Sequence, residues 1–274
     1  MREMSSAREL VARRELLWNL TLRELRGRYK RSLLGWGWSL LNPIAFMLIY
    51  TFAFSVILGS DPEPGNPSGL SNYALHLMCG LLPWTFFNVS VTTSMGSVIA
   101  NGALVRKVAF PREHLVVSTV AAGLFTLGVE LFVLSVALAF FGNVVLVWVP
   151  MILLTTVLLA VFATGFGLAL AAGVVYFRDL SYLWSIVVQG WFFATPIVYP
   201  PSLAAQQLSD HPTVLRIYND LPMAVVARIF RDLMYDLRMP RLLDYGLLTG
   251  YAAVAMLFGW WIFDRLESRF AEEL

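Results

Sequence analysis

The sequence predicts an all-α integral membrane protein with six transmembrane helices, an N-terminal interfacial helix and re-entrant helices before the last span. Of its 274 residues, 58% are hydrophobic and only 14% are charged, whereas soluble domains carry roughly a quarter charged residues. The hydrophobic residues also gather in runs of about 20, the length that a helix needs to cross a bilayer. No linker is long enough to separate two domains, so we treat residues 1–274 as a single transmembrane domain.

Residues 1–35 form a basic segment with nine Arg and Lys residues, which we expect to be a cytoplasmic helix at the membrane interface. The apolar residues that share one helical face are Val11, Trp18, Leu22, Leu25 and Tyr29. Such a helix would place its Arg and Lys side chains among the lipid headgroups. The alternative is a basic anchor that only orients the first span.

Six apolar stretches follow this segment, and each predicts one span. Their approximate limits are 39–58, 75–99, 115–141, 147–175, 182–198 and 242–263. In the fourth stretch, Gly165, Ala169 and Gly173 recur every four residues. Small residues at this spacing allow helix backbones to approach closely in a membrane, so we expect a packing face there.

Glu130 is the only acidic residue well inside a predicted span, and its neighbours in the sequence are apolar. An intramembrane carboxyl is costly and is a candidate functional group. A hydrogen-bonded or protonated carboxyl inside a helical bundle is the alternative, and the sequence leaves both open.

Basic residues alternate between the connections and set the orientation. Residues 101–114 carry Arg106, Lys107 and Arg112, whereas the connections on either side carry no Lys or Arg. Because basic loops stay on the cytoplasmic side, both termini and residues 101–114 are predicted to be cytoplasmic.

Residues 199–241 are external by parity, although they contain five Arg, because long connections obey the charge rule weakly. The segment contains Pro200, Pro201, Pro212, Pro222 and Pro240, and apolar stretches such as LPMAVVARIF that are too short to span. A run of about ten apolar residues suits a re-entrant helix. We therefore expect two short helices dipping back from the outer face; a surface loop with one amphipathic helix is the alternative.

The sequence offers no arrangement of residues suited to catalysis or metal binding. The single cysteine, Cys79, lies in an apolar run, and His76, His114 and His211 are scattered. Neither lysine, Lys30 or Lys107, follows a glycine as a nucleotide-binding loop requires. We therefore expect no catalytic residue, metal, cofactor or nucleic-acid partner for this chain, and any uphill transport must draw its energy from a partner.

The stretch NGALVRKVAFPREHL, residues 101–115, interleaves charges with large apolar side chains. Asn101 is placed to cap a short helix, and Pro111 marks its approximate end. Apolar anchors rimmed by charge are typical of protein-docking surfaces. A helix lying on the lipid headgroups is the alternative.

Several segments together resemble the membrane subunit of polysaccharide-exporting ABC type-2 transporters, which serve O-antigen, capsule and teichoic-acid export. They occur in the family's order and cover most of the chain: RELRGRYKRSLLGWGWSLLNPI (23–44), GLLPWTFF (80–87), NGALVRKVAFPRE (101–113), YFRDLSYLW (176–184) and ATPIVYP (194–200).

The resemblance implies a homodimer with two cytoplasmic ABC ATPase subunits, in the bacterial inner membrane, with ATP and Mg bound by the ATPases. It implies that residues 101–114 are a coupling loop inserted into the ATPase. The expected contacts are Leu104, Val105, Arg106, Lys107, Val108, Phe110, Arg112 and Glu113. It also supports re-entrant gate helices within residues 199–241.

The resemblance further implies a lipid-linked polysaccharide as substrate, which needs an entrance for its pyrophosphate and a wet conduit for its sugars. Arg28, Tyr29, Lys30 and Arg31 are candidates for the entrance, although they could equally meet anionic membrane lipids. The conduit candidates are Trp84, Phe86, Phe87, Asn88, Trp191, Phe192 and Tyr199. Aromatic belts at the membrane interfaces are the alternative for the aromatic members.

Three other functions compete with this interpretation. An ABC type-2 exporter of a lipid or drug would share the fold but not the GRYKRSLLG segment. A membrane-embedded enzyme such as a glycosyl transferase would need clustered acidic residues. A passive channel would not need the apolar plug at residues 105–110.

Overall fold

The computed structural model of the chain describes residues 14–28, 37–57, 64–108, 110–199, 206–207 and 209–273, and its regular elements there are all helical. The helices are α2 Arg14–Arg28, α3 Gly37–Tyr50, η1 Thr51–Ile57, α4 Tyr73–Ala100, α5 Gly102–Lys107, α6 Glu113–Phe140, η2 Val145–Trp148, α7 Val149–Tyr176, α8 Leu180–Ala194, α10 Pro212–Asn219, α11 Pro222–Phe230, η3 Arg231–Asp236, α12 Leu242–Glu267 and α13 Phe270–Glu273.

Each of the six apolar stretches predicted as a span coincides with a helix. Among the described residues, four helical stretches are long and apolar enough to cross a membrane: α4, α6, η2 with α7, and α12. The other two predicted spans correspond to shorter apolar helices, at Ile44–Ala53 within α3 and η1 and at α8. The all-α membrane class is therefore confirmed, and the count of six spans stays a prediction.

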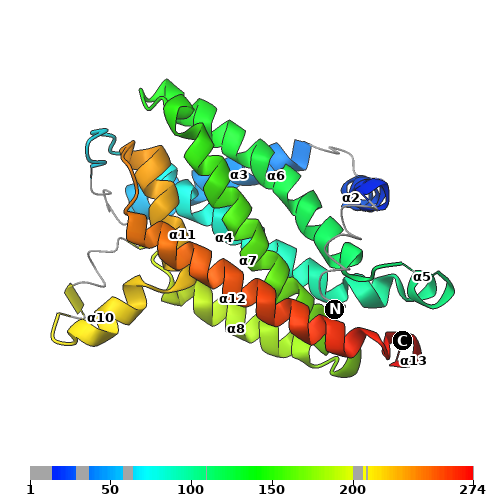
Figure 1. Cartoon of the computed structure of the whole chain (residues 1–274). Helices are drawn as coiled ribbons and strands as arrows, with labels where there is room; N and C mark the ends of the chain where they lie inside the picture. Colours follow the sequence, from blue (N-terminus) through cyan, green and yellow to red (C-terminus); the bar gives the residue numbers. More distant parts are fainter. Residues whose placement is uncertain are drawn as a thin grey trace.

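The long helices run alongside one another, and the short elements gather at the two ends of this bundle (Figure 1). Helices α5 and α13 lie at one end, where α2 crosses the direction of the bundle and is seen end-on. Helices α10 and α11 lie at the opposite end. This separation agrees with the predicted topology, in which the basic connections face one side and residues 199–241 face the other.

Helix α2 packs against α6, through only part of the face that the sequence suggested. Leu20 and Leu25 are buried, whereas Trp18 is 63% exposed. The predicted apolar face is therefore divided: Leu25 packs on the protein, Leu22 is half-buried and Trp18 is exposed, and the interfacial position of the helix stays a prediction. An exposed indole is compatible with that prediction, because an indole is well suited to a lipid headgroup region.

Helices α7 and α12 pack with their backbones in contact. A Cβ atom added at Gly165 would collide with the backbone of Ala255, and one added at Gly259 would collide with the carbonyl of Gly165. The packing prediction for Gly165 is thus confirmed. At Gly173 an added Cβ would lie 2.6 Å from a methyl group of Leu180, a side chain that is able to move.

In the described part of residues 199–241, the short helices α10 and α11 have different surroundings, and η3 continues directly from α11. In α10, no residue is buried, whereas seven of the nine residues of α11 are buried, and α11 packs against α4 and α12. The alternative of a surface loop with one amphipathic helix therefore does not describe α11. Whether α11 reaches membrane depth stays a prediction.

Candidate functional site

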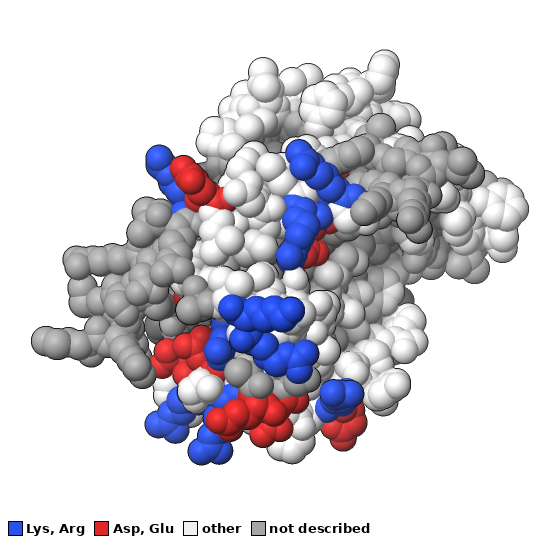
Figure 2. Space-filling model, turned by 90° about the vertical axis from the view of Figure 1, so that its right-hand side faces the viewer, with Lys and Arg blue, Asp and Glu red and all other residues white. Residues whose placement is uncertain are grey.

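The end of the bundle that carries α5 and α13 displays several basic and acidic side chains (Figure 2). Basic and acidic side chains lie side by side there, on an otherwise uncharged surface. The exposed charged residues of these elements include Arg106 and Lys107 on α5 and Glu272 and Glu273 on α13. Such a mixed surface suits contact with another protein more than contact with lipid tails.

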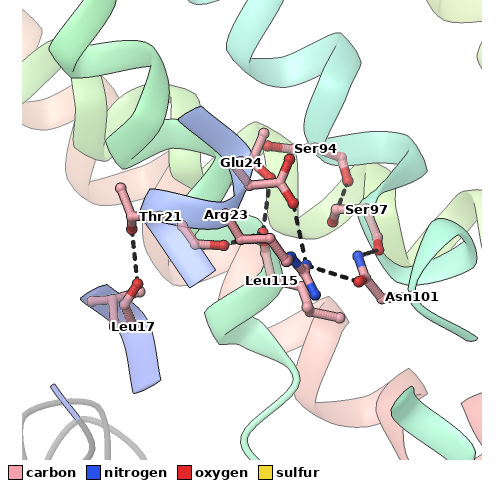
Figure 3. Close-up of polar contacts among 10 residues, drawn as sticks. Leu17, Thr21, Arg23, Glu24, Ser94, Ser97, Asn101 and Leu115 are labelled. Carbon is pink, nitrogen blue, oxygen red and sulfur yellow. Dashed lines mark hydrogen bonds and ion pairs between the residues drawn. The ribbon is translucent and has the colours of Figure 1, made fainter. Parts of the chain in front are cut away.

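Asn101 occupies the N-cap position of α5, as the sequence predicted, but its side chain makes no capping hydrogen bond. The Asn101 carbonyl accepts hydrogen bonds from the backbone N–H groups of Leu104 and Val105, at 2.9 and 3.0 Å. The side chain turns back instead: its Nδ2 donates to the carbonyl of Ser97, and its Oδ1 accepts from Arg23 of α2, both at 2.8 Å (Figure 3). Asn101 therefore joins α4, α5 and α2 at one point.

The predicted docking residues divide between two faces of the segment. Arg106, Lys107 and Val108 are exposed, with Val108 at 51%, and they form an outward face. Val105 is 4% exposed, and Leu104 is half-buried. Val105 therefore holds α5 in place and is not available at the surface.

The inward face of α5 rests on the C-terminal part of the chain. Val105 belongs to a buried cluster that also contains Leu20 of α2, Phe263 of α12 and Phe270 of α13, and Phe110 packs against this cluster. The ring of Phe270 lies edge-on to that of Phe263, with centroids 5.4 Å apart. Helix α5 is thus supported from behind by α13 and, through it, by the end of α12.

Two further predicted docking residues, Arg112 and Glu113, also face the protein. Arg112 is half-buried, donates through Nη1 to the carbonyl of Glu267 and lies over the ring of Phe270. Glu113 is 6% exposed. The structure therefore places Arg112, Glu113, Val105 and Phe110 in the support of the segment, and the outward face is smaller than the sequence suggested.

The candidates for the pyrophosphate entrance cannot be placed. The structure describes the backbone of Arg28 at the end of α2, and its side chain and residues Tyr29, Lys30 and Arg31 lie outside the described residues.

The aromatic conduit candidates of α4 are packed inside the chain. Trp84, Phe86 and Phe87 are at most 4% exposed. Phe87 stacks on Phe162 of α7, with ring centroids 5.3 Å apart, and meets Trp191 of α8 at the same distance. The expectation that Trp84, Phe86 and Phe87 line an open path does not fit this arrangement, because their rings fill the core where α4, α7 and α8 meet.

Trp191, Phe192 and Tyr199 are partly exposed. Trp191 and Phe192 pack against the same core from α8. The hydroxyl of Tyr199 lies 2.5 Å from that of Tyr218 in α10 and donates to the carbonyl of Phe193 at 2.8 Å. Tyr199 therefore ties the end of the ATPIVYP segment to α10.

A polar face lies beside this aromatic core on α4 and α8. Thr92 and Thr93 are exposed, and Asn88 is half-buried. The hydroxyl of Thr92 donates to Oδ1 of Asn88 and accepts from the indole of Trp184, both at 3.2 Å. Ser185 and Gln189 of α8 are also exposed; the sequence reasoning missed them, although their four-residue spacing was visible.

Exposed polar groups in the apolar middle of a bundle indicate a surface that faces water or another protein. The outer side of α6 and α7 has the opposite character. An apolar groove of about 700 Å³ runs between these helices, and Phe132 and Leu153 are among its lining residues. The exposed surface of α6 and α7 along this groove is apolar, whereas α4 and α8 expose polar side chains next to apolar ones such as Val89 and Ile186.

Glu130 lies at the edge of the bundle interior, 9% exposed, in a small apolar cavity with Met78 and Leu134 among its lining residues. Within the described ranges, no group of three or more His, Cys, Asp or Glu residues is close enough to hold a metal ion.

Comparison with known proteins gives two findings. The family model described as ABC-2 type transporter matches residues 15–209. An O-antigen export system permease protein RfbA from Myxococcus xanthus is 33% identical over 273 residues, which cover 97% of this chain and 98% of that protein. Two proteins of the same name from Klebsiella pneumoniae are 31% and 30% identical over 264 and 266 residues, covering 95% of each chain.

Proposed function

Because the chain belongs to the ABC-2 type transporter family, we propose that it is the transmembrane subunit of an ATP-driven exporter of a lipid-linked polysaccharide in the bacterial inner membrane. The choice of a polysaccharide as substrate is supported by the similarity to O-antigen export permeases along nearly the whole length of both chains. O-antigen, a cell-wall glycan or teichoic acid on a polyprenyl pyrophosphate are the candidate substrates.

The proposed docking site for the ATPase is the outward face of α5. Arg106, Lys107 and Val108 combine two charges with an exposed apolar side chain at the charged end of the molecule. The buried face of α5 holds it against α13 and the end of α12. A displacement of α5 by the ATPase would therefore push against α12, which is locked to α7 by the contact between Gly165 and Gly259.

The proposed translocation path lies between two copies of the subunit, along the polar face of α4 and α8. Thr92, Thr93 and Gln189 are exposed although they lie on apolar helices. Leaving such groups against lipid is unfavourable, whereas a wet path hydrates them and lets them hydrogen-bond to sugar hydroxyls. The apolar groove on α6 and α7 would face lipid.

In the proposed cycle, ATP binding draws two ATPase subunits together and displaces the two α5 helices. The two copies of the chain then rearrange, and the path between them opens for the lipid-linked glycan. Repeated cycles would move a polymer outward.

Reconstitution tests the proposal directly. The chain and its ATPase are placed in vesicles with a fluorescently labelled lipid-linked glycan, and its movement across the membrane is followed. Movement should require ATP and both proteins. Movement by the chain alone, without any ATPase, would contradict the proposal.

The substrate class is tested by depleting the protein in cells and identifying what accumulates on the cytoplasmic side of the membrane. A lipid-linked glycan supports the proposed function. Accumulation of a free lipid or a drug, with glycan export unchanged, would favour the alternative, an ABC type-2 exporter of a lipid or drug.

A further inference from the structure

A polar cavity lies at the end of the molecule opposite α5, among α10, α11, η3, the beginning of α4 and residues 64–66. Its volume is about 460 Å³. The arginine, aspartate and histidine side chains among its lining residues are His76, Arg228, Arg231, Asp232, Asp236 and Arg238. Nothing in the proposed transport cycle uses this cavity.

Two of the three arginines that line the cavity form ion pairs with aspartates. Arg228 binds the carboxylate of Asp244 through both Nε and Nη2, at 3.1 and 2.7 Å. Arg238 pairs with Asp232 at 2.5 Å and with Asp236 at 3.2 Å. Both acidic residues of the lining are therefore already engaged by Arg238.

Arg231 is the exception. No carboxylate of the described residues lies within ion-pair distance of it. Its side chain is held by two carbonyl groups instead: Nη1 donates to Pro196 at 2.7 Å, and Nη2 donates to Ile197 at 2.8 Å. Its Nε is buried without a hydrogen-bond partner in the described part of the chain.

Only 6% of the Arg231 surface is exposed, so water hydrates little of its guanidinium group. Burial lowers the pKa of Arg231 to about 10, which still leaves the guanidinium protonated at neutral pH. Asp236 interacts with Arg231 only beyond ion-pair distance and is itself paired with Arg238. A buried charge that lacks a directly paired counter-ion is costly. A cavity that borders such a charge favours an anion, because a carboxylate or phosphate forms charge-assisted hydrogen bonds with a guanidinium.

We propose that this cavity binds an acidic sugar unit, with its carboxylate or phosphate held by Arg231. Its volume lies within the range of about 300–1,000 Å³ that is usual for small-molecule sites. The polar lining offers further donors and acceptors for sugar hydroxyls. Binding of the anion follows from the geometry of the cavity, and its origin in the exported glycan rests on the proposed function.

The test measures binding directly and needs no transport. The full chain is purified into nanodiscs of phosphatidylcholine and titrated by calorimetry with glucose 1-phosphate and with methyl glucuronide. Methyl glucoside, which carries no charge, is the matched control. The two anionic sugars should bind at least tenfold more tightly than methyl glucoside. Equal affinity for all three would overturn the proposal, whatever the outcome of the reconstitution.

Variants locate the binding site. Arg231→Gln should abolish the preference for anionic sugars, and Arg231→Lys should retain part of it. Because Arg231 also holds Pro196 and Ile197, a second variant leaves that contact intact. Asn66→Asp adds a negative charge at an exposed residue of the cavity lining and should weaken anion binding at least tenfold, whereas Asn66→Gln should not. Unchanged affinity in Asn66→Asp would contradict the proposed site.

Two more titrations identify the source of the anion. Inorganic phosphate should bind more weakly than glucose 1-phosphate if the sugar contributes contacts; equal affinity would overturn the assignment to a sugar. Nanodiscs of phosphatidylglycerol test a lipid headgroup as the occupant. Loss of sugar binding in that lipid would show that the headgroup phosphate fills the cavity, and would also overturn the assignment.

Discussion

At the scale of single residues, two valines of the segment around α5 have different surroundings and therefore different roles. Val105 and Val108 are three positions apart, and one is buried while the other is half exposed. The sequence predicted both as contacts of a docked protein, since both are apolar in a charged loop. Only Val108 remains a candidate contact, because Val105 is occupied by the C-terminal part of its own chain.

Val108→Glu should abolish co-purification of the chain with its ATPase. A carboxylate would be desolvated without a partner in the proposed contact, whereas in the free chain it stays in water. Co-purification and membrane insertion are measured together. Val108→Thr, which changes neither size nor charge greatly, is the control and should keep the complex. Full recovery of the complex with Val108→Glu would remove α5 as the docking element.

Phe270→Ala should weaken the support of α5. Truncation of a buried phenylalanine costs about 3–5 kcal/mol in protein cores, and Phe270 is fully buried against Phe263 and Tyr176. We expect a lower midpoint of thermal unfolding and, in vesicles, less glycan moved per ATP hydrolysed. Phe258→Ala, at an exposed position of α12, is the control. Unchanged stability and unchanged coupling would show that α13 does not support α5.

At the scale of helices, two glycines of α12 differ in the space around them: Gly259 touches α7, whereas a Cβ added at Gly250 would have no neighbour within 4 Å. Gly259→Ala should destabilise the protein by about 1–3 kcal/mol, the usual cost of overpacking, since its Cβ would meet the Gly165 carbonyl. Gly250→Ala in the same helix, where nothing lies within 4 Å, should be tolerated. Thermal unfolding of both variants compares them. Equal midpoints would contradict the backbone contact.

The helices themselves were largely predictable from the sequence, because apolar length decides whether a segment can span a bilayer. The ends of α4, α6 and α12 lie within four residues of the predicted limits. What apolar length does not decide is which neighbour a side chain meets. Trp84 packs against Trp191, and Phe87 packs against both Phe162 and Trp191; these partners come from helices distant in the sequence.

At the scale of the whole molecule, the described helices differ in how many polar side chains they expose. The groove on α6 and α7 is apolar, whereas α4 and α8 expose hydroxyl and amide groups near their middle. The amino-acid composition of the whole chain does not reveal this difference, because it does not say which residues are exposed on which helix. The packing of α8 against α4, with the indole of Trp184 donating to Thr92, places the exposed polar residues of both helices on neighbouring elements, which the sequence alone did not pair.

Water access tests this difference between the helices. The only cysteine, Cys79, is buried, so Cys79→Ser provides a background for single added thiols. In the assembled complex, Ser185→Cys should react with a charged, membrane-impermeant thiol reagent at least tenfold faster than Leu153→Cys in the apolar groove. The rate of labelling is measured by mass spectrometry. Equal rates would show that the polar face is not hydrated.

The backbone contact of Gly165 with Gly259 has a further consequence for how the chain changes shape. Two helices whose main chains touch cannot roll over one another, because any rotation brings bulkier positions into the gap. We therefore expect α7 and α12 to move together as one rigid unit. Sliding is easier where rings fill the interface, as between α4 and α8, since aromatic side chains keep favourable contacts over a range of offsets and tilts. We therefore expect α7 and α12 to keep their contact when the chain changes shape, and relative movement to occur first between α4 and α8.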